Sequence, residues 1–214
     1  MNIILASASA GRKKILESLH FPFTVIPADI DERKIIASNP ITLVKRIARA
    51  KALAVLENVG AGRDRPAFSG EPRLAPTIII AADSMVLFRG KTYGKPKDKK
   101  EAIKMLTMLS GQTHEFITGL CVLALTLQDH LLQKLIVKSC KSYVTFEKFT
   151  KEEIEKYVSV ADVTKFAGGF APDLKGGELI KPKMHIKGSK SNVLGGLPLE
   201  ILLPNIEEFL LKKK

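Results

Sequence analysis

The chain begins with an apolar segment that becomes basic across a few small residues, and this junction constrains the local fold more than any other feature. Ile3–Leu5 predict a short buried β-strand, and a helical pattern begins near Ala10. The small residues at positions 6–11 between them let the backbone come close to a ligand. Neither a Walker loop nor a dinucleotide-binding fingerprint is present, because both require glycine spacings that this turn lacks.

Four polar side chains make this turn a candidate phosphate cradle. The free N–H groups at the start of a helix, together with the positive end of its dipole, stabilise an anion. Ser7 and Ser9 add hydroxyl donors, and Arg12 and Lys13 add positive charge. The alternative is that Ser9 only caps a helix that packs on the core.

The size and composition are those of an ordinary soluble protein. With 214 residues, of which 45% are hydrophobic and 26% are charged, the chain can form one domain or two closely packed lobes. The longest apolar run, Leu120–Leu127, is much shorter than the ~18 residues of a membrane span and favours a strand. The amino terminus lacks the pattern of a secretory signal, so we expect a cytoplasmic protein without a membrane partner.

The net charge of +12 raises the question of a nucleic-acid partner. A nucleic-acid-binding face concentrates its cations, whereas the lysines here are spread over the expected helix starts, helix faces and chain end. Most of them are therefore interpreted as solvated surface, and a minority as part of a polyphosphate-binding cleft. No stable complex with nucleic acid is expected.

Two groups of carboxylates stand out against this basic background. Asp29, Asp31 and Glu32 fall within one loop, which either is a solvated turn or uses Asp31 or Glu32 to help hold a divalent cation. Asp83 follows the most apolar segment, 77–82, and is expected at the C-terminal end of a buried strand. A buried carboxylate is costly unless it binds a metal, acts as a base or transfers a proton, so Asp83 is the candidate catalytic residue.

Two lysines are candidates for binding the same ligand. Lys51 lies near the apolar side of a long helix that starts at Asn39 and Pro40, and it either extends its ammonium group to water or points it into a cleft. Lys95 belongs to the turn Gly94-Lys95-Pro96, which follows a predicted hairpin and would present the side chain rigidly.

The remaining segments predict a mixture of helices and strands. Long antiparallel strands are expected at about 115–127 and 132–146, and the segment 60–76, rich in Gly, Pro and Arg, is expected to be a surface loop insertion. Capping signals at Asp98 and Thr150 predict the starts of two further helices.

Taken together, the motifs resemble those of the Maf family in order and approximate spacing. They are Leu5-Ala-Ser7-Ala-Ser9, Asp29-Ile-Asp31-Glu32, Arg46-Ile-Ala-Arg-Ala-Lys51, Ala82-Asp83-Ser84, Gly94-Lys95-Pro96, Leu109-Ser110-Gly111, Ala167-Gly168 and Gly195-Gly196-Leu197-Pro198-Leu199. Each motif is weak alone, but eight motifs in the family's order over nearly the whole chain are not expected by chance.

The resemblance implies an α/β fold similar to that of the inosine triphosphate pyrophosphatases, with a mixed sheet in two lobes around a nucleotide-binding cleft. Residues 1–214 would form a single Maf-like domain. Maf proteins are nucleoside triphosphate pyrophosphatases that release a nucleoside monophosphate and diphosphate with a divalent cation such as Mg²⁺ or Mn²⁺. Some are associated with inhibition of cell division, so a non-catalytic protein that regulates septum formation or binds nucleic acid is an alternative. A homodimer is one expected assembly.

By match to the family motifs, Asp83 would be the catalytic carboxylate and would bind the metal with the help of Glu32. Two groups of residues would hold the triphosphate. They are the cradle residues Ser7, Ser9, Arg12 and Lys13 and the two lysines Lys51 and Lys95. The physical role of the cations would be to neutralise charge on the phosphate oxygens during in-line displacement.

Three departures from the family pattern bear on the base. The branch acting on dTTP and UTP usually carries arginine, lysine and glutamine where this chain has Gly11, Phe166 and Asp173. The chain is more similar to the branch that hydrolyses 7-methyl-GTP, in which the third position is acidic. The Asp173 carboxylate would accept hydrogen bonds from the N–H groups of a guanine-type base. We therefore expect 7-methyl-GTP or another modified nucleotide as substrate, with dTTP and UTP as the alternative.

Overall fold

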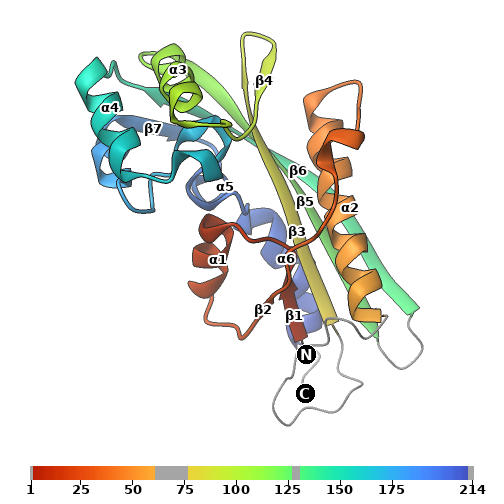
Figure 1. Ribbon diagram of the computed structural model, residues 1–214. Helices are drawn as coiled ribbons and strands as arrows, with labels where there is room; N and C mark the ends of the chain where they lie inside the picture. Colours follow the sequence, from red (N-terminus) through yellow and green to blue (C-terminus); the bar gives the residue numbers. More distant parts are fainter. Residues whose placement is uncertain (1, 61–76, 127–130, 212–214) are drawn as a thin grey trace.

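The computed structural model describes residues 2–60, 77–126 and 131–211 and contains one mixed β-sheet (Figure 1). Its strands are β1 (Asn2–Leu5), β2 (Thr24–Val25), β3 (Thr77–Phe88), β4 (Lys91–Tyr93), β5 (Thr113–Thr126), β6 (Leu131–Phe146) and β7 (Met184–Lys187). They follow the order β2-β1-β3-β5-β6-β7, and β4 pairs with one end of β3. β1 is parallel to β2 and β3, and the other pairs are antiparallel. The predicted α/β class with a mixed sheet is thus confirmed.

β3 is longer than the sequence predicts. It continues through Asp83 to Phe88, so Asp83 lies in the middle of a strand and not at its C-terminal end. The reason is the partner strand, because β5 pairs with β3 from Thr77 to Leu87 without interruption. The polar pair Asp83-Ser84 therefore lies inside the β3–β5 pairing, at a point where the sequence alone predicts that the strand ends.

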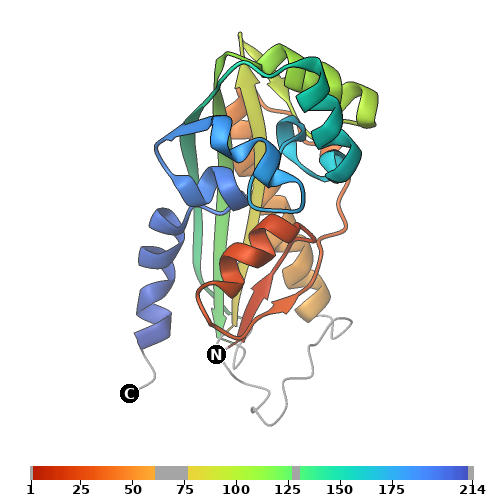
Figure 2. The same cartoon turned by 90° about the vertical axis from the view of Figure 1, so that its left-hand side faces the viewer.

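Both faces of β3 are covered, which explains its almost continuous apolar sequence. Successive side chains of a strand point to opposite faces. Ile79 and Ala81 pack with the long helix α2 (Pro40–Gly60) on one face. Ile78 and Ile80 pack on the other face with residues of α1 (Ala10–Glu17) and α6 (Leu199–Leu211) (Figures 1 and 2).

A second lobe surrounds the other end of the long strands. Its elements are α3 (Lys99–Leu109), α4 (Lys151–Val160), β7 and α5 (Lys190–Gly195), and its core is rich in aromatic side chains (Figure 1). The strands β3, β5 and β6 run through both lobes, so the two cores share one sheet. The sheet in two lobes agrees with the prediction. A single Maf-like domain stays a prediction.

The predicted helix starts are confirmed by their caps. The Asn39 side chain accepts a hydrogen bond from the Thr42 amide, and Thr150 forms a reciprocal capping box with Glu153. Among the described residues, no helix combines the length and apolar character needed to span a bilayer. The predicted loop insertion at 60–76 lies almost entirely outside the described residues.

Candidate active site

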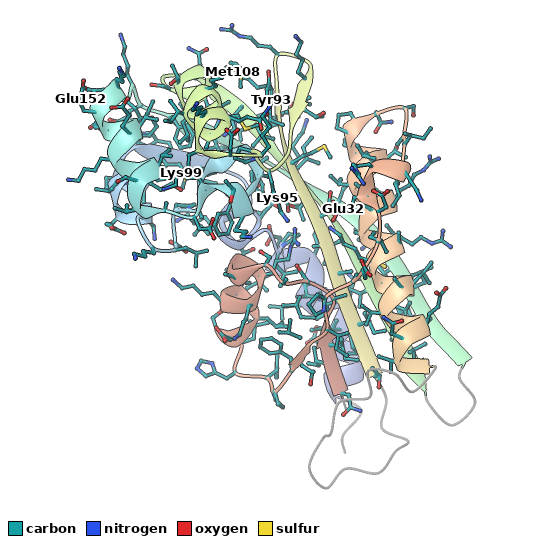
Figure 3. All side chains as sticks on the ribbon, viewed as in Figure 1. Glu32, Tyr93, Lys95, Lys99, Met108 and Glu152 are labelled. Atoms are coloured by element: carbon teal, nitrogen blue, oxygen red, sulfur yellow. The ribbon has the colours of Figure 1, made fainter. Side chains whose placement is uncertain are left out.

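A cleft with a volume of about 630 Å³ lies where the two lobes meet, a size typical of small-molecule sites. Its polar lining comes from the β1–α1 turn, the acidic loop, α2, the turn after β4 and the segment after α4: Ser7, Ser9, Arg12, Glu32, Lys51, Lys95, Asp162, Lys165 and Lys175. An adjoining pocket shares several of these residues and adds Asp83, Ser84 and Phe170. Figure 3 labels Glu32 and Lys95, two of the cleft residues, near the middle of the molecule. Seven of the nine predicted site residues therefore lie in one place.

The cleft opens beside a stretch of β3 along one edge of which no other described strand pairs. β1 pairs with β3 only as far as Ile80, and β4 begins to pair at Val86. Between these points the described strands leave one edge of β3 uncovered. Asp83 and Ser84 lie in this gap, and they point to opposite faces of the sheet.

Lys51, Glu32 and Asp83 form the charged centre of the cleft. The Lys51 Nζ lies 2.8 Å from Asp83 Oδ1 and 2.8 Å from Glu32 Oε1. The side chains of Lys51 and Asp83 are only 11% and 13% exposed, whereas that of Glu32 is 46% exposed. Of the two predicted orientations of Lys51, the structure therefore selects the one that points into the cleft.

Arg12 joins three parts of the site. Its guanidinium group donates to the Gly196 carbonyl at 3.1 Å, to Ser7 Oγ at 2.9 Å and to Ser84 Oγ at 3.2 Å. Burial lowers the pKa of Arg12, and the negative charges of Asp83 and Glu32 oppose that shift. Arg12 also lines the cleft, and a guanidinium group carries more N–H donors than these three contacts use.

The serines of the turn hold its shape and keep hydroxyl protons to donate. Ser7 Oγ accepts from the Ser9 amide at 3.2 Å as well as from Arg12. Ser9 caps α1, with its hydroxyl 3.5 Å from the Arg12 amide. The two interpretations of Ser9, as cap and as part of the cradle, are thus compatible.

Lys95 lies at the mouth of the cleft on an exposed turn. Partial burial lowers its pKa, and the nearby positive charges of Arg12 and Lys51 lower it further. The turn is anchored by a hydrogen bond of 2.9 Å from the Gly168 amide to the Gly94 carbonyl. A cation held close to two others is stabilised when an anionic ligand enters.

Two predicted site residues lie elsewhere. Lys13 is on the outer side of α1, where it forms an exposed ion pair of 3.7 Å with Glu17. Asp173 forms an ion pair with Lys181, and its carbonyl accepts a hydrogen bond from Lys14. Neither Lys13 nor Asp173 lines the cleft.

Glu32 and Asp83, the predicted metal ligands, lie on either side of one ammonium group. Within the described ranges, no three His, Cys, Asp or Glu side chains are grouped as a metal site. Glu32 and Asp83 alone face each other across Lys51 Nζ. Two carboxylates suit Mg²⁺ or Mn²⁺, because such ions commonly take one or two protein carboxylates and complete their coordination with substrate phosphates and water. The donor set therefore fits the predicted cation.

The chain matches one protein-family model over nearly its whole length. The model of the Maf family, described as Maf-like protein, matches residues 2–209. The chain belongs to the Maf family.

Its curated relatives are similar over almost their whole length. The dTTP/UTP pyrophosphatase of Pyrococcus furiosus is 36% identical over 205 residues, which are 96% of this chain and 94% of the relative. The enzyme of the same name from Bacillus anthracis is 33% identical over 207 residues, or 97% and 95% of the two chains. A solved structure of the Staphylococcus aureus Ham1 protein covers 98% of this chain and 100% of its own, with 13% identity and a TM-score of 0.41.

Three members of the hydrogen-bond network around Arg12 are not predicted from the sequence as site residues. Ser84 belongs to the motif Ala82-Asp83-Ser84, where it has no predicted role, yet its hydroxyl accepts a hydrogen bond from Arg12 and lies 2.8 Å from the buried Thr118 hydroxyl. Thr118 interrupts an apolar strand, which was the available signal. The Gly196 carbonyl, in contrast, gives no signal in the sequence, because any residue carries one.

Proposed function

We propose that this Maf-family protein hydrolyses the α–β phosphoanhydride of a nucleoside triphosphate and releases a nucleoside monophosphate and diphosphate. The observation that carries the proposal is the meeting of two carboxylates, Glu32 and Asp83, with three cations, Arg12, Lys51 and Lys95, in one cleft. The cations match a polyphosphate, and the carboxylates supply a base and metal ligands. The activity of the curated relatives supports the same class.

The chemistry follows from these charges. A water molecule attacks the α-phosphorus, its proton passes to the Asp83 carboxylate, and the bond from that phosphorus to the bridging oxygen breaks, so that diphosphate leaves. Arg12, Lys51 and Lys95 neutralise charge on the phosphate oxygens. The hydroxyl groups of the β1–α1 turn donate hydrogen bonds that hold the same oxygens in place. A cation bound by Glu32 and Asp83 would supply further charge neutralisation.

The decisive experiment replaces Asp83 by asparagine. Asp83→Asn removes the base and a metal ligand but keeps the shape of the side chain, so turnover should fall by about 100-fold or more. Diphosphate release is measured on a panel of nucleoside triphosphates. Asp29→Asn is the control, because Asp29 is an exposed carboxylate outside the cleft. Wild-type turnover in a folded Asp83→Asn protein would refute the assignment.

For the base, dTTP and UTP are the first candidates. They are supported by the curated relatives, which are 33–36% identical and bear the name dTTP/UTP pyrophosphatase. Asp173, the residue expected to read a guanine, is paired with Lys181 outside the cleft.

A second candidate, 7-methyl-GTP, is favoured by one observation. Phe166, which is half-buried, lines both the cleft and the adjoining pocket. The methylated guanine ring carries positive charge, and a cation is attracted to an aromatic face. The same substrate panel separates the two candidates. The one with the higher kcat/KM is retained, and Phe166→Leu should reduce activity on 7-methyl-GTP more than on UTP if the ring selects the methylated base.

A further inference from the structure

We propose that Lys51 excludes a divalent cation from Glu32 and Asp83 until a phosphate chain offers its ammonium group another acceptor. The inference rests on the proposed function, because a polyphosphate is what would draw the ammonium group away. It makes Lys51 a residue that orders the binding of metal and nucleotide.

The first argument is the position of the ammonium group. Lys51 Nζ lies 2.8 Å from one oxygen of each carboxylate, so these two oxygens are no farther apart than twice that distance. A small divalent cation that bridged Glu32 and Asp83 would need the same space. Ammonium and metal therefore compete for one position.

The second argument is burial. Lys51 is 9% exposed as a whole residue, and so is Asp83. Removing one partner of a buried ion pair leaves the other charge uncompensated, which is strongly unfavourable. A metal that displaces the ammonium group without giving it a new partner incurs this cost, so its affinity for the free protein is reduced.

A nucleotide changes this balance. Lys51 lines the same cleft as the phosphate cradle formed by Ser7, Ser9 and Arg12. Phosphate oxygens placed there can replace Glu32 and Asp83 as the partners of the Lys51 ammonium group. The freed carboxylates are then available to the metal that accompanies the nucleotide.

The test measures Mn²⁺ binding without nucleotide, through loss of the electron paramagnetic resonance signal of free Mn²⁺. Lys51→Met nearly keeps the length of the side chain but removes its charge. The Mn²⁺ dissociation constant should fall by at least ~10-fold in this variant, and Glu32→Gln in the Lys51→Met background should abolish the gain. If Lys51→Met does not fold, Lys51→Gln takes its place in both comparisons.

The matched control is Lys95→Met, which removes one positive charge from the same cleft. Lys95 forms no described ion pair with Glu32 or Asp83, so its loss should change the dissociation constant by less than ~3-fold. Equal Mn²⁺ affinity in wild type and Lys51→Met overturns the inference. An equal gain in Lys95→Met also overturns it, because the effect would then be general electrostatics.

A second arm tests release by phosphate. Wild-type protein should retain Mn²⁺ when α,β-methylene-UTP is added at saturation, and failure to retain it contradicts the role of the phosphate chain. Failure of the proposed function is distinguishable from failure of the inference. A protein that hydrolyses nucleotides without a gain in Lys51→Met refutes only the inference, and one that shows the gain but hydrolyses none refutes only the function.

Discussion

His114 is a buried residue whose ionisation is linked to folding. It is 2% exposed, its ring lies 5.2 Å from that of Phe146 and 5.6 Å from that of Phe170, and neither ring nitrogen has a hydrogen-bond partner among the described residues. Burial lowers the pKa of His114 from 6.5 to about 4. The folded protein therefore keeps this imidazole neutral over a pH range in which the unfolded chain binds a proton.

The consequence is a loss of stability between pH 6.5 and pH 4. As the pH falls through this range, the unfolded state binds a proton at His114 that the folded state does not bind. The free energy of unfolding should therefore fall by up to ~3 kcal/mol. His114→Leu should remove this part of the slope in urea titrations at several pH values. His185→Gln, at an exposed histidine paired with Glu147, should retain it. An unchanged slope in His114→Leu would assign the pH dependence to other groups.

Asp173 remains a predicted base-reading residue, although its contacts favour a structural role. Its carboxylate is paired with Lys181, and its side chain is 21% exposed. If the ion pair only orders the loop, Asp173→Gln and Lys181→Met should change kcat/KM for UTP and 7-methyl-GTP by the same factor. If Asp173 contacts the base, Asp173→Gln alone should reduce activity on 7-methyl-GTP by about 10-fold more than on UTP. The ratio of the two kcat/KM values is the measurement.

At the scale of elements, the distance between α2 and the sheet sets the geometry of the site. Gly119 on β5 lies opposite Asp83 in register. A Cβ atom at Gly119 would be 2.3 Å from the Val44 carbonyl oxygen of α2. Only glycine permits this approach, and the same helix carries Lys51 to Asp83 about two turns later.

Gly119→Ala should therefore disturb both stability and activity. The helix must shift to relieve a contact with backbone, which should cost about 1–3 kcal/mol of unfolding free energy. Since the shift also moves Lys51, kcat should fall even at temperatures where the variant is folded. Gly94→Ala is the control for stability, because a Cβ there meets no atom within 4 Å. Equal unfolding free energies for wild type and Gly119→Ala would show that α2 adjusts without strain.

At the scale of the whole molecule, the two lobes are joined by continuous strands. β3 contributes Ile78 and Ile80 to one core and Val86 and Phe88 to the other. Unfolding one lobe would leave half of each long strand without its partners. The cleft therefore lies between two parts of one sheet, and the charged groups that line it are held by a shared scaffold.

This arrangement predicts a single cooperative unfolding transition, as expected of a single domain. Differential scanning calorimetry should give one peak with a calorimetric enthalpy equal to the van't Hoff enthalpy. α,β-Methylene-UTP with Mg²⁺ should raise the midpoint of that one peak, because a ligand that binds only the folded state stabilises it. Two resolved peaks would mean that the lobes unfold independently, contrary to the predicted single domain.

The sequence by itself determined the local features of this protein. Helix starts could be predicted at Asn39, Asp98 and Thr150, because a cap is made by residues within a few positions of one another. The apolar strand before Asp83 and the small-residue turn before Arg12 were visible for the same reason. The family motifs then supplied most of the polar residues that line the cleft.

Only the tertiary structure decided which of these residues meet. Lys51 contacts Glu32 and Asp83, which are 19 and 32 positions away, through the packing of α2 on β3. The pairing of strands distant in sequence carries β3 past Asp83, and the other described strands leave one edge of β3 unpaired beside the cleft. Asp173 could be matched to a motif, but its ion pair with Lys181 depends on the path of a loop. Periodicity and capping describe neighbours along the chain, whereas an active site is made by neighbours in space.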